Sequence, residues 1–324
     1  MREEARAFWI VAPGRGEIRG EALSPPSDRD VVVRTLFSGI SRGTESLVFG
    51  GHVPESEWER MRAPFQAGDF PAPVKYGYAN VGRVIEGPDD LANRIVFVLY
   101  PHQTQFVVPA TAVHVVPGDV PPERAVLAAN LETALNGVWD ARPHVGDRIS
   151  VVGAGTVGCL AAWLASGIRG CEVELIDVNP RRTRVADALG LRFREPATAA
   201  NDADVVIHAS GSPAGLDLAL RLAAVEARVV ELSWFGDHVV PLRLGGTFHS
   251  RRLTIRSSQV GRLAPAQQSR WDAERRMQLA LRLLREPALD ALITGESAFE
   301  ALPDVMADLS RSPGDTITHR IRYS

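Results

Sequence analysis

The stretch Ile149-Ser150-Val151-Val152-Gly153-Ala154-Gly155-Thr156-Val157-Gly158 joins an apolar run to three glycines in G-x-G-x-x-G spacing. The apolar run predicts a strand, and the residues after it predict a helix. Gly153 would permit the tight turn, Gly155 would let backbone amides approach a pyrophosphate, and Gly158 would let the helix pack closely on the strand. This context predicts a dinucleotide site in which the helix N-terminus faces the phosphates, with Thr156 and Val157 beside the ligand.

An acid stands where this kind of site needs one. Asp177 ends the next predicted strand, 172–177, and lies 19 residues after Gly158. Its carboxylate is expected to accept the two ribose hydroxyls of the adenosine half and to repel a 2′-phosphate, which favours NAD(H) over NADP(H). Arg181 and Arg182 follow closely, and one of them could instead accommodate a 2′-phosphate.

Strand and helix patterns divide the chain into two parts. The first 120 residues are rich in predicted strands, whereas strands and helices alternate from Pro121 onward. Alternation of this kind predicts βαβ units and a parallel sheet. The fold class is therefore expected to be α/β, with a β-rich part preceding the nucleotide-binding part.

Composition narrows the classes of function. The 324 residues are 45% hydrophobic, carry a formal net charge of −3, and include two cysteines, Cys159 and Cys171. A chain without a basic surplus is not expected to bind nucleic acid, and two cysteines make no disulfide framework. No apolar run is long enough to span a membrane, and the N-terminal residues lack the pattern of a secretion signal, so a cytoplasmic protein without membrane partners is expected.

The segment Gly39-Ile40-Ser41-Arg42-Gly43-Thr44-Glu45, together with this order of parts, resembles the medium-chain dehydrogenase/reductase superfamily, the alcohol dehydrogenase-like proteins. The resemblance implies a GroES-like catalytic domain from residues 1–120 and 265–324, a Rossmann domain at 121–264, and a small-molecule substrate in the cleft. It also implies a homodimer formed through the sheet edge at 253–258. The phrase Ser-Arg-Gly-Thr-Glu is similar to that of bacteriochlorophyllide hydroxyethyl dehydrogenase-type proteins, which oxidise a secondary alcohol.

The sequence departs from the zinc-dependent members of this superfamily. Ser41 and Arg42 stand where the first zinc-ligating Cys falls, Tyr78 stands at the position of the His ligand, and Ala129 aligns with the third ligand. None of these is a usual zinc ligand. The sequence therefore predicts a zinc-independent member with no metal site.

Without zinc, another group must stabilise charge on the reacting oxygen. Tyr78 is the first candidate, and Lys75, the only lysine of the chain, could lower its pKa or contact an acidic substrate. The resemblance implies a proton relay through Thr44, with Glu45 beside it. Glu45 could instead pair with Arg42 and brace the loop, Ser41 could hydrogen-bond the substrate, and Tyr78 could simply fill the space of the lost site.

Four further residues are expected to bind the cofactor. The resemblance places Thr133 at the nicotinamide face and includes the phrase containing Ser210, and the segment after the strand predicted at 228–232 brings Ser233 and Trp234 near the nicotinamide end. His102 is interpreted as a lone loop histidine.

Three functions remain open. The first is a zinc-independent, NAD(H)-dependent oxidoreductase that acts on a secondary alcohol or ketone. The second is an NADPH-dependent reductase of a conjugated double bond or quinone. Asp177 disfavours this function, because its carboxylate is expected to repel the 2′-phosphate of NADPH. The third is a nucleotide-binding protein without catalysis.

Overall fold

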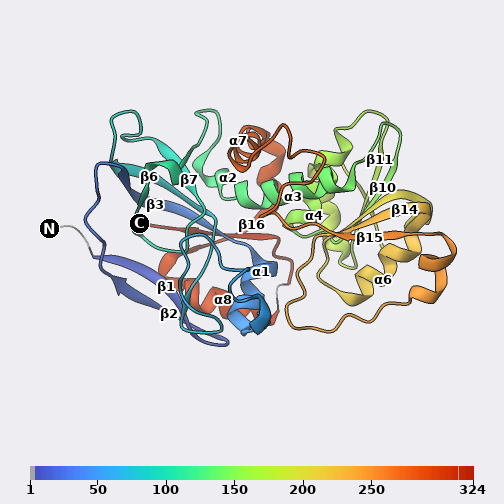
Figure 1. Ribbon diagram of the computed structural model, residues 1–324, viewed down its shortest axis with the longest axis horizontal. Coiled ribbons are helices and arrows are strands. Elements are labelled where there is room, and N and C mark those ends of the chain that lie inside the picture. Colours follow the sequence, from blue (N-terminus) through green and yellow to red (C-terminus); the bar gives the residue numbers. More distant parts are fainter. Residues whose placement is uncertain (1–3, 313) are drawn as a thin grey trace. The chain divides into compact units, whose positions relative to one another are not determined.

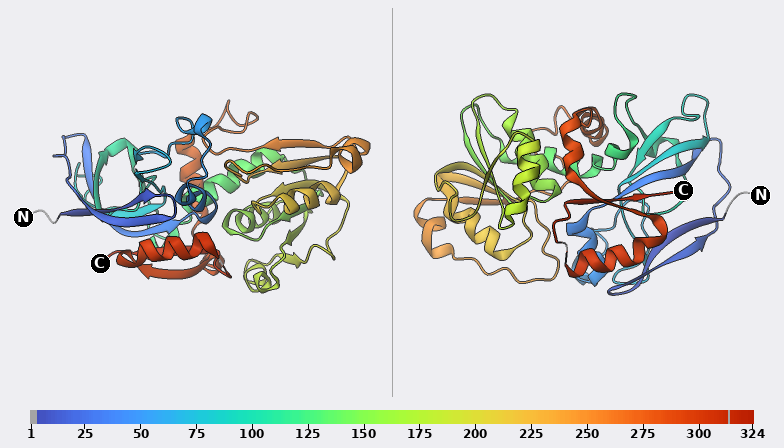
Figure 2. Two further views of the ribbon diagram at one scale, coloured as in Figure 1. Left: turned by 90° about the horizontal axis from the view of Figure 1, so that it is seen from below. Right: turned by 180° about the vertical axis from the view of Figure 1, so that it is seen from behind.

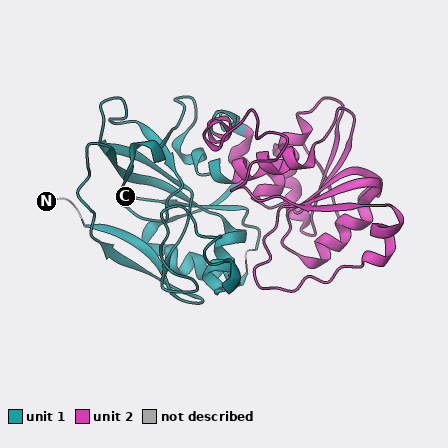
Figure 3. Cartoon of the chain, viewed as in Figure 1, with its two compact units in different colours: residues 1–129, 281–287, 293–324 teal, residues 130–280, 288–292 magenta. Residues whose placement is uncertain are grey.

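The computed structural model describes residues 4–312 and 314–324 of the chain. The chain forms two compact units, which are coloured separately in Figure 3. Unit 1 comprises residues 1–129, 281–287 and 293–324, and unit 2 comprises residues 130–280 and 288–292. The chain thus leaves unit 1 after Ala129 and returns after Ala280, later on both occasions than the domain limits expected from the sequence.

Unit 1 contains two sheets, whose strands are coloured from blue to teal, with two red strands, in Figure 1. The larger sheet has the order β16-β17-β3-β6-β7-β9, and β8 also pairs with β3. The smaller sheet has the order β2-β1-β5-β4. The strands of the larger sheet are β3 (Asp30–Ile40), β6 (Asn80–Glu86), β7 (Ile95–Val98), β8 (Gln105–Pro109), β9 (His114–Val115), β16 (Ile293–Ala298) and β17 (Thr318–Arg322). Those of the smaller sheet are β1 (Ala5–Ala12), β2 (Arg15–Glu21), β4 (Ala67–Gly68) and β5 (Val74–Lys75).

The helices of unit 1 are α1 (Arg42–Gly50), α2 (Pro122–Ala125) and α8 (Leu302–Arg311), with 3₁₀ turns at Glu55–Glu57, Ala110–Ala112 and Phe299–Ala301. Helix α1 follows β3 directly and packs against α8. It is capped by Gly51, whose φ of 76° lies in the left-handed region that glycine adopts without strain. The core beneath the larger sheet consists of valines with Tyr100 and Phe106, whose rings stack at 3.8 Å.

Unit 2 is built on one sheet with the order β12-β11-β10-β13-β14-β15, and every neighbouring pair in it is parallel. The strands are β10 (Arg148–Val152), β11 (Glu172–Ile176), β12 (Arg192–Arg194), β13 (Ala203–His208), β14 (Ala223–Glu231) and β15 (Thr254–Ser257). The chain runs outward from β10 to β12 and then crosses to β13 on the other side of β10. That reversal is the point at which open α/β sheets bind ligands, beyond the carboxyl ends of the strands.

Helices α4 (Thr156–Ser166) and α6 (Pro213–Leu222) lie along the strands of this sheet, as the two views in Figure 2 show. The shorter elements are α5 (Thr183–Ala188), 3₁₀ turns at Pro180–Arg182 and Pro287–Leu292, and a π turn at Leu244–Phe248. Helices α3 (Ala128–Ala141) and α7 (Ala273–Leu283) also lie mainly in this unit. Leu216, Ala219 and Leu220 of α6 pack into the apolar core with residues of β10, β13 and β14.

The expected α/β class, with a β-rich unit and a parallel-sheet unit, is confirmed. The helical segment that follows Pro121 forms two helices, α2 and α3, because the helix breaks between Ala125 and Ala128. The residues after Ser41, expected as a loop, form helix α1. β15 is an edge strand of its sheet, so a dimer formed through it stays a prediction. Among the residues that the structure describes, no helix is long and apolar enough to cross a membrane.

Candidate functional site

A chain of buried hydrogen bonds runs through unit 1 from the start of helix α1. Glu45, only 3% exposed, accepts the backbone N–H of Ser41 at 2.7 Å, which holds its carboxylate over the first turn of the helix. The second oxygen of Glu45 lies 2.8 Å from Nε2 of His102, itself 1% exposed. The guanidinium of Arg42 donates to the carbonyl of Thr316 at 3.1 Å. The expected Glu45–Arg42 brace stays a prediction.

The series of buried hydrogen bonds continues on the other side of the His102 ring. Nδ1 of His102 lies 2.7 Å from the Ser38 hydroxyl, which lies 2.9 Å from the hydroxyl of Tyr323. A carboxylate only accepts, so Nε2 donates to Glu45. In neutral His102, Nδ1 then accepts from Ser38, and Ser38 accepts from Tyr323. Every buried polar atom along this path has a partner without placing a positive charge on the ring.

Tyr78 lies beside this chain and is partly exposed. The side chains of Ser41 and Thr44 hydrogen-bond its phenol, which favours ionisation, but burial and the nearby charge of Glu45 outweigh them and raise the pKa of Tyr78 to about 12. The phenol therefore keeps its proton at neutral pH and can act as a hydrogen-bond donor. The structure thus brings together four of the five predicted catalytic residues: Ser41, Thr44, Glu45 and Tyr78.

Lys75 does not join them. Its ammonium, in a side chain 6% exposed, donates to the Gln103 side chain at 2.7 Å and lies 3.4 Å from the carboxylate of Glu21. The Lys75 nitrogen also lies over the rings of Trp9 and Tyr100, 5.8 Å from each ring centroid. Because these groups hold Lys75 and the pKa of Tyr78 is raised, the expectation that Lys75 lowers that pKa is wrong.

His102, Ser38 and Tyr323 are functional candidates that the sequence pattern does not single out. His102 follows a proline in the short loop between β7 and β8, and Glu45 lies 57 positions earlier. Only the fold brings them together. The sole sequence signal is a polar pair, His102 and Gln103, between two apolar strands, and both side chains prove to be buried.

The residues at the superfamily's zinc-ligand positions do not fit that metal. Zinc sites in proteins use thiolate, imidazole and carboxylate ligands. Ser41 and the protonated Tyr78 supply none of these ligand groups, and Ala129 has no ligand atom. Glu45 and His102 are ligand types, but they are hydrogen-bonded to each other.

In unit 2 the glycine loop has the geometry that a pyrophosphate requires. Gly153 has a φ of 107°, and a Cβ there would lie 2.6 Å from the backbone of Ser210. A Cβ on Gly158 would lie 1.8 Å from the carbonyl oxygen of Gly153, so only glycine lets α4 start this close to the loop. A Cβ on Gly155, in contrast, would meet nothing within 4 Å. The outer side of the loop is therefore open where the N-terminus of α4, with Thr156 and Val157, faces outward.

Asp177 follows β11 and turns toward the same loop. One oxygen of its carboxylate accepts the N–H of Ala154 at 2.7 Å, and the other accepts the N–H of Asn179 at 2.8 Å. Each carboxylate oxygen has further acceptor capacity, which suits ribose hydroxyls. The side chain of Arg182 is buried and that of Arg181 is exposed, so Arg181 is the better placed of the two to meet a 2′-phosphate.

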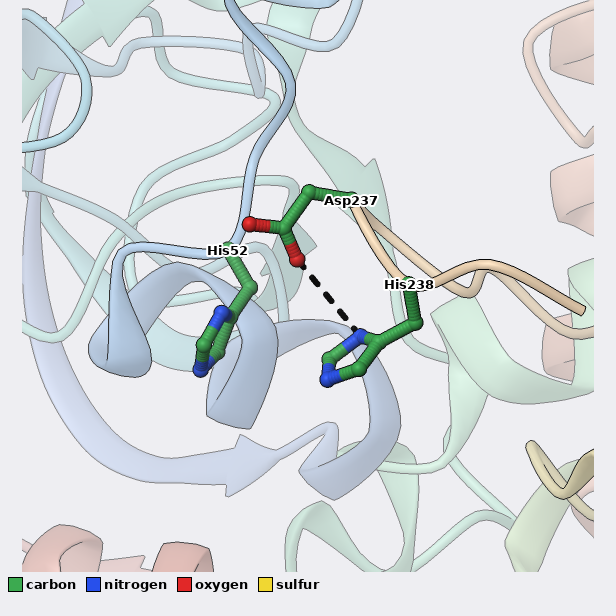
Figure 4. Close-up of side chains that lie close together, drawn as sticks. All are labelled: His52, Asp237 and His238. Carbon is green, nitrogen blue, oxygen red and sulfur yellow. Dashed lines mark ion pairs between the residues drawn. The ribbon is translucent and has the colours of Figure 1, made fainter.

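The remaining predicted cofactor residues lie on three segments of unit 2. Thr133 is on α3, next to Glu132, whose carboxylate forms a buried ion pair with Arg276 at 3.0 Å. Ser210 follows β13, and Ser233 and Trp234 follow β14. The loop after β14 is folded back by His238, whose Nδ1 donates to the Phe235 carbonyl at 2.8 Å. Figure 4 shows the exposed Asp237 carboxylate facing the same ring nitrogen, at 3.6 Å; His52, also drawn, belongs to unit 1.

No protein-family model matches the sequence. The chain is 28% identical to 2-desacetyl-2-hydroxyethyl bacteriochlorophyllide A dehydrogenase of Rhodobacter capsulatus over 239 residues, 68% of this chain and 69% of that protein. It is 27% identical to an uncharacterized zinc-type alcohol dehydrogenase-like protein of Haemophilus influenzae, over 97% of each. The crystal structure of a protein described as a zinc-binding dehydrogenase from Sinorhizobium meliloti, bound to NADP, superimposes with a TM-score of 0.79 at 18% identity. That alignment covers 99% of this chain and 100% of the other.

The structural likeness shows the fold, a GroES-like domain joined to a Rossmann domain. The sequence relatives are dehydrogenases or alcohol dehydrogenase-like proteins of the zinc type. The comparisons therefore indicate an NAD(P)-dependent dehydrogenase of the medium-chain type.

Proposed function

We propose that this protein is a zinc-independent oxidoreductase that interconverts a secondary alcohol and a ketone with NAD(H). The observation that carries the proposal is the group of hydroxyls formed by Tyr78, Ser41 and Thr44 next to the buried Glu45. The family resemblance aligns Ser41 and Tyr78 with zinc-ligand positions of zinc-dependent members, and the group supplies hydrogen-bond donors where zinc would supply positive charge.

The role of Tyr78 follows from its protonation. A bound nicotinamide would supply or accept the hydride, and the protein must deliver a proton to the substrate oxygen or remove one from it. A protonated phenol fixed by two hydroxyls can donate to that oxygen and stabilise the charge that develops on it. Thr44 and Ser41 then replace the lost proton or hold the phenol in position. Because Tyr78 stays protonated at neutral pH, ketone reduction is the better supported direction.

Glu45 and His102 are proposed to keep Tyr78 protonated and in position. The carboxylate of Glu45, fixed by the Ser41 N–H and His102, raises the pKa of Tyr78 and so keeps the phenol a donor. The buried path through Ser38 and Tyr323 holds His102 in one tautomer. These side chains touch each other and are proposed to act on the substrate only through Tyr78, Ser41 and Thr44.

The choice of cofactor rests on Asp177. A carboxylate that caps the glycine loop favours the two free ribose hydroxyls of NAD(H) and disfavours the 2′-phosphate of NADP(H). The structural neighbour from Sinorhizobium meliloti is bound to NADP. The preference of this protein for NAD(H) over NADP(H) therefore needs a direct test. The name of the Rhodobacter relative, a dehydrogenase of a hydroxyethyl group, supports a secondary alcohol as the substrate class.

The test is a two-by-two comparison of initial rates with the purified protein. NADH and NADPH are each combined with a panel of ketones and with a panel of conjugated enones and quinones. Oxidation of NADH by ketones, with enones reduced at the carbonyl, supports the proposal. Oxidation of NADPH with saturation of the carbon–carbon double bond would instead establish the double-bond reductase, and NADH binding without any turnover would establish the non-catalytic alternative.

A further inference from the structure

The sheet of unit 2 carries polar side chains at the amino ends of three neighbouring strands. Ser150 of β10, Glu174 of β11 and Arg192 of β12 are paired in register, and we call them the inner row. Two residues nearer the amino ends, Arg148 of β10 is paired with Glu172 of β11, and we call these two the edge row. Both rows lie on the same face, because side chains alternate along a strand. Parallel strands are ordinarily apolar and buried on both faces, so packing alone does not explain these rows.

The connections between the strands explain why this face is open. Helices α4 and α5 connect β10 to β11 and β11 to β12, and right-handed crossovers place both on one face of the sheet. The connection from β12 back to β13 runs the opposite way and therefore lies over the other face. It comprises residues 195–202, all of them described, and contains turns but no helix. Helix α6 covers the carboxyl half of that face, where Val152, Ile176 and Val206 belong to its apolar core.

A cavity of about 590 Å³ lies at the uncovered amino half. Both rows line it, as do Ala200 and Asp202 of the loop between β12 and β13. Its volume is that of a site for a small molecule. The glycine loop follows the carboxyl end of β10, so the cavity lies at the opposite edge of the sheet from the dinucleotide site.

The hydroxyl of Ser150 points to a ligand in this cavity. Ser150 is 3% exposed, yet its hydroxyl has no hydrogen-bond partner among the described residues. Burying a hydroxyl without a partner costs free energy, and an apolar residue would suit this strand better. Because Ser150 lines the cavity, its hydroxyl is available to a bound molecule.

The inner row has an excess of positive charge. One oxygen of Glu174 accepts Nε of Arg194 at 3.1 Å and lies 3.8 Å from the guanidinium of Arg192. Its other oxygen accepts the N–H of Ala200 at 3.1 Å. One carboxylate thus serves two guanidinium groups, and the side chain of Arg192 remains 61% exposed. Arg192 and the Ser150 hydroxyl together can donate to a ligand carboxylate.

The edge row has an excess of negative charge. Arg148 forms ion pairs with both Asp202 and Asp204. Glu172 is exposed, and the described residues supply no ion pair for its carboxylate. Helix α4 ends at Ser166, which also lines the cavity, so the negative end of the helix dipole faces the same region. This end of the cavity can accept hydrogen bonds from an ammonium group.

We propose that the cavity is a second ligand site, which binds a small zwitterion with its ammonium group at the edge row and its carboxylate at the inner row. A simple anion would meet the unpaired Glu172, and a simple cation would meet Arg192. The rows lie about 7 Å apart along the strands. An α-amino acid carries both charges on one carbon, whereas the ends of an extended dipeptide are separated by about 7 Å. The site therefore matches a zwitterion of dipeptide size, and it does not depend on the proposed dehydrogenase activity.

The test is saturation-transfer NMR with the full-length protein, followed by titration. Glycylglycine is the probe. Its matched controls are N-acetyl-glycylglycine, which lacks the ammonium group, and glycylglycine amide, which lacks the carboxylate. We expect glycylglycine to bind, and each capped form to bind about tenfold more weakly, because each loses one charge-assisted hydrogen bond.

Three substitutions show which group holds which charge. In Glu172→Gln, glycylglycine and its acetylated form should bind equally, because the ammonium group has lost its partner. In Arg192→Gln, glycylglycine and its amide should bind equally. Ser150→Ala should weaken glycylglycine binding about tenfold without lowering the melting temperature, since the hydroxyl makes no hydrogen bond within the fold. The Kd for NADH should stay the same in all three variants.

The inference would be overturned by any of three results. These are no saturation transfer to glycylglycine, equal binding of the capped and uncapped forms to the unmodified protein, or unaltered binding of all probes to the three variants. A lower melting temperature in Ser150→Ala would also contradict it, because the hydroxyl would then have a structural role. Failure of the proposed function would appear instead as absence of NADH binding or turnover, which none of these probes reports.

Discussion

At the scale of single residues, Tyr78 shows how surroundings decide chemistry. The same phenol could serve as an acid or a base, and the choice depends on its pKa. Burial and the Glu45 carboxylate push that pKa up to about 12, so Tyr78 acts as a donor. The sequence places Tyr78 near Thr44 only through a family resemblance. The packing that fixes the direction of the shift appears only in the fold.

The substitution Tyr78→Phe removes this donor and leaves the ring. We expect kcat for ketone reduction to fall about 100-fold, since one lost donor to a developing oxyanion costs on that order, while the Kd for NADH stays the same. Tyr76→Phe is the matched control, because Tyr76 is a buried neighbour whose ring packs edge-on against Tyr78 at 6.0 Å. If both variants retain full kcat, Tyr78 only fills space.

The surroundings of Lys75 and His102 cannot be predicted from the sequence around each residue. The only lysine attracts attention in the sequence, yet it is held by Glu21 and Gln103, away from Tyr78. His102 is interpreted from the sequence as a lone loop histidine, yet its side chain is buried and hydrogen-bonded to Glu45. Both outcomes depend on side-chain directions in short loops, which no periodic pattern specifies.

At the scale of elements, local patterns predict some boundaries closely and others not at all. Helix α4 begins directly after the glycine loop, as the sequence predicts, and helix α6 begins at a proline; in both, apolar residues recur at helical spacing. The pattern does not indicate β2, Arg15–Glu21, because six of its seven residues are charged or glycine, and the strand is ordered by its pairing with β1. It does not indicate α1 either, whose first turn contains Gly43 and is braced by Glu45.

The glycine loop offers a matched pair of substitutions. Gly158→Ala should destabilise the protein by about 2 kcal/mol, because its Cβ would overlap the carbonyl of Gly153 and the helix must move. Gly155→Ala should leave stability unchanged, since its φ of −80° suits any residue and the Cβ meets open space. It should nevertheless weaken NADH binding about tenfold or more by occupying the approach to the loop amides.

Thermal unfolding and NADH titration of the two variants check this pair. Normal NADH affinity in Gly155→Ala would mean that the open side of the loop is not where the pyrophosphate lies. An unaltered melting temperature in Gly158→Ala would contradict the close packing of α4 against the loop.

At the scale of the whole molecule, the tyrosines predict how stability changes at high pH. The chain has four tyrosines, and burial raises the pKa of every one, with Tyr78 at about 12. In the unfolded chain they ionise near the ordinary value of about 10. Above that pH the unfolded state loses protons that the folded state retains, so the free energy of unfolding falls as the pH rises.

Lys75, whose pKa is lowered by burial, acts in the opposite direction near pH 10, but it is one group against four. Urea unfolding measured at steps from about pH 9 to about pH 11.5 should show a steady loss of stability. Absorbance of the folded protein should show little tyrosinate at pH 10. Substantial tyrosinate in the folded protein at that pH would contradict the burial described here.

The central claim is that hydroxyls and a buried carboxylate take the place of zinc. The most direct measurement is the rate of NADH oxidation by a ketone substrate, with protein treated with a strong chelator and then analysed for bound metal. We expect full activity with no stoichiometric zinc and no increase when zinc is added back. Activity that disappears with the metal and returns with zinc would contradict it.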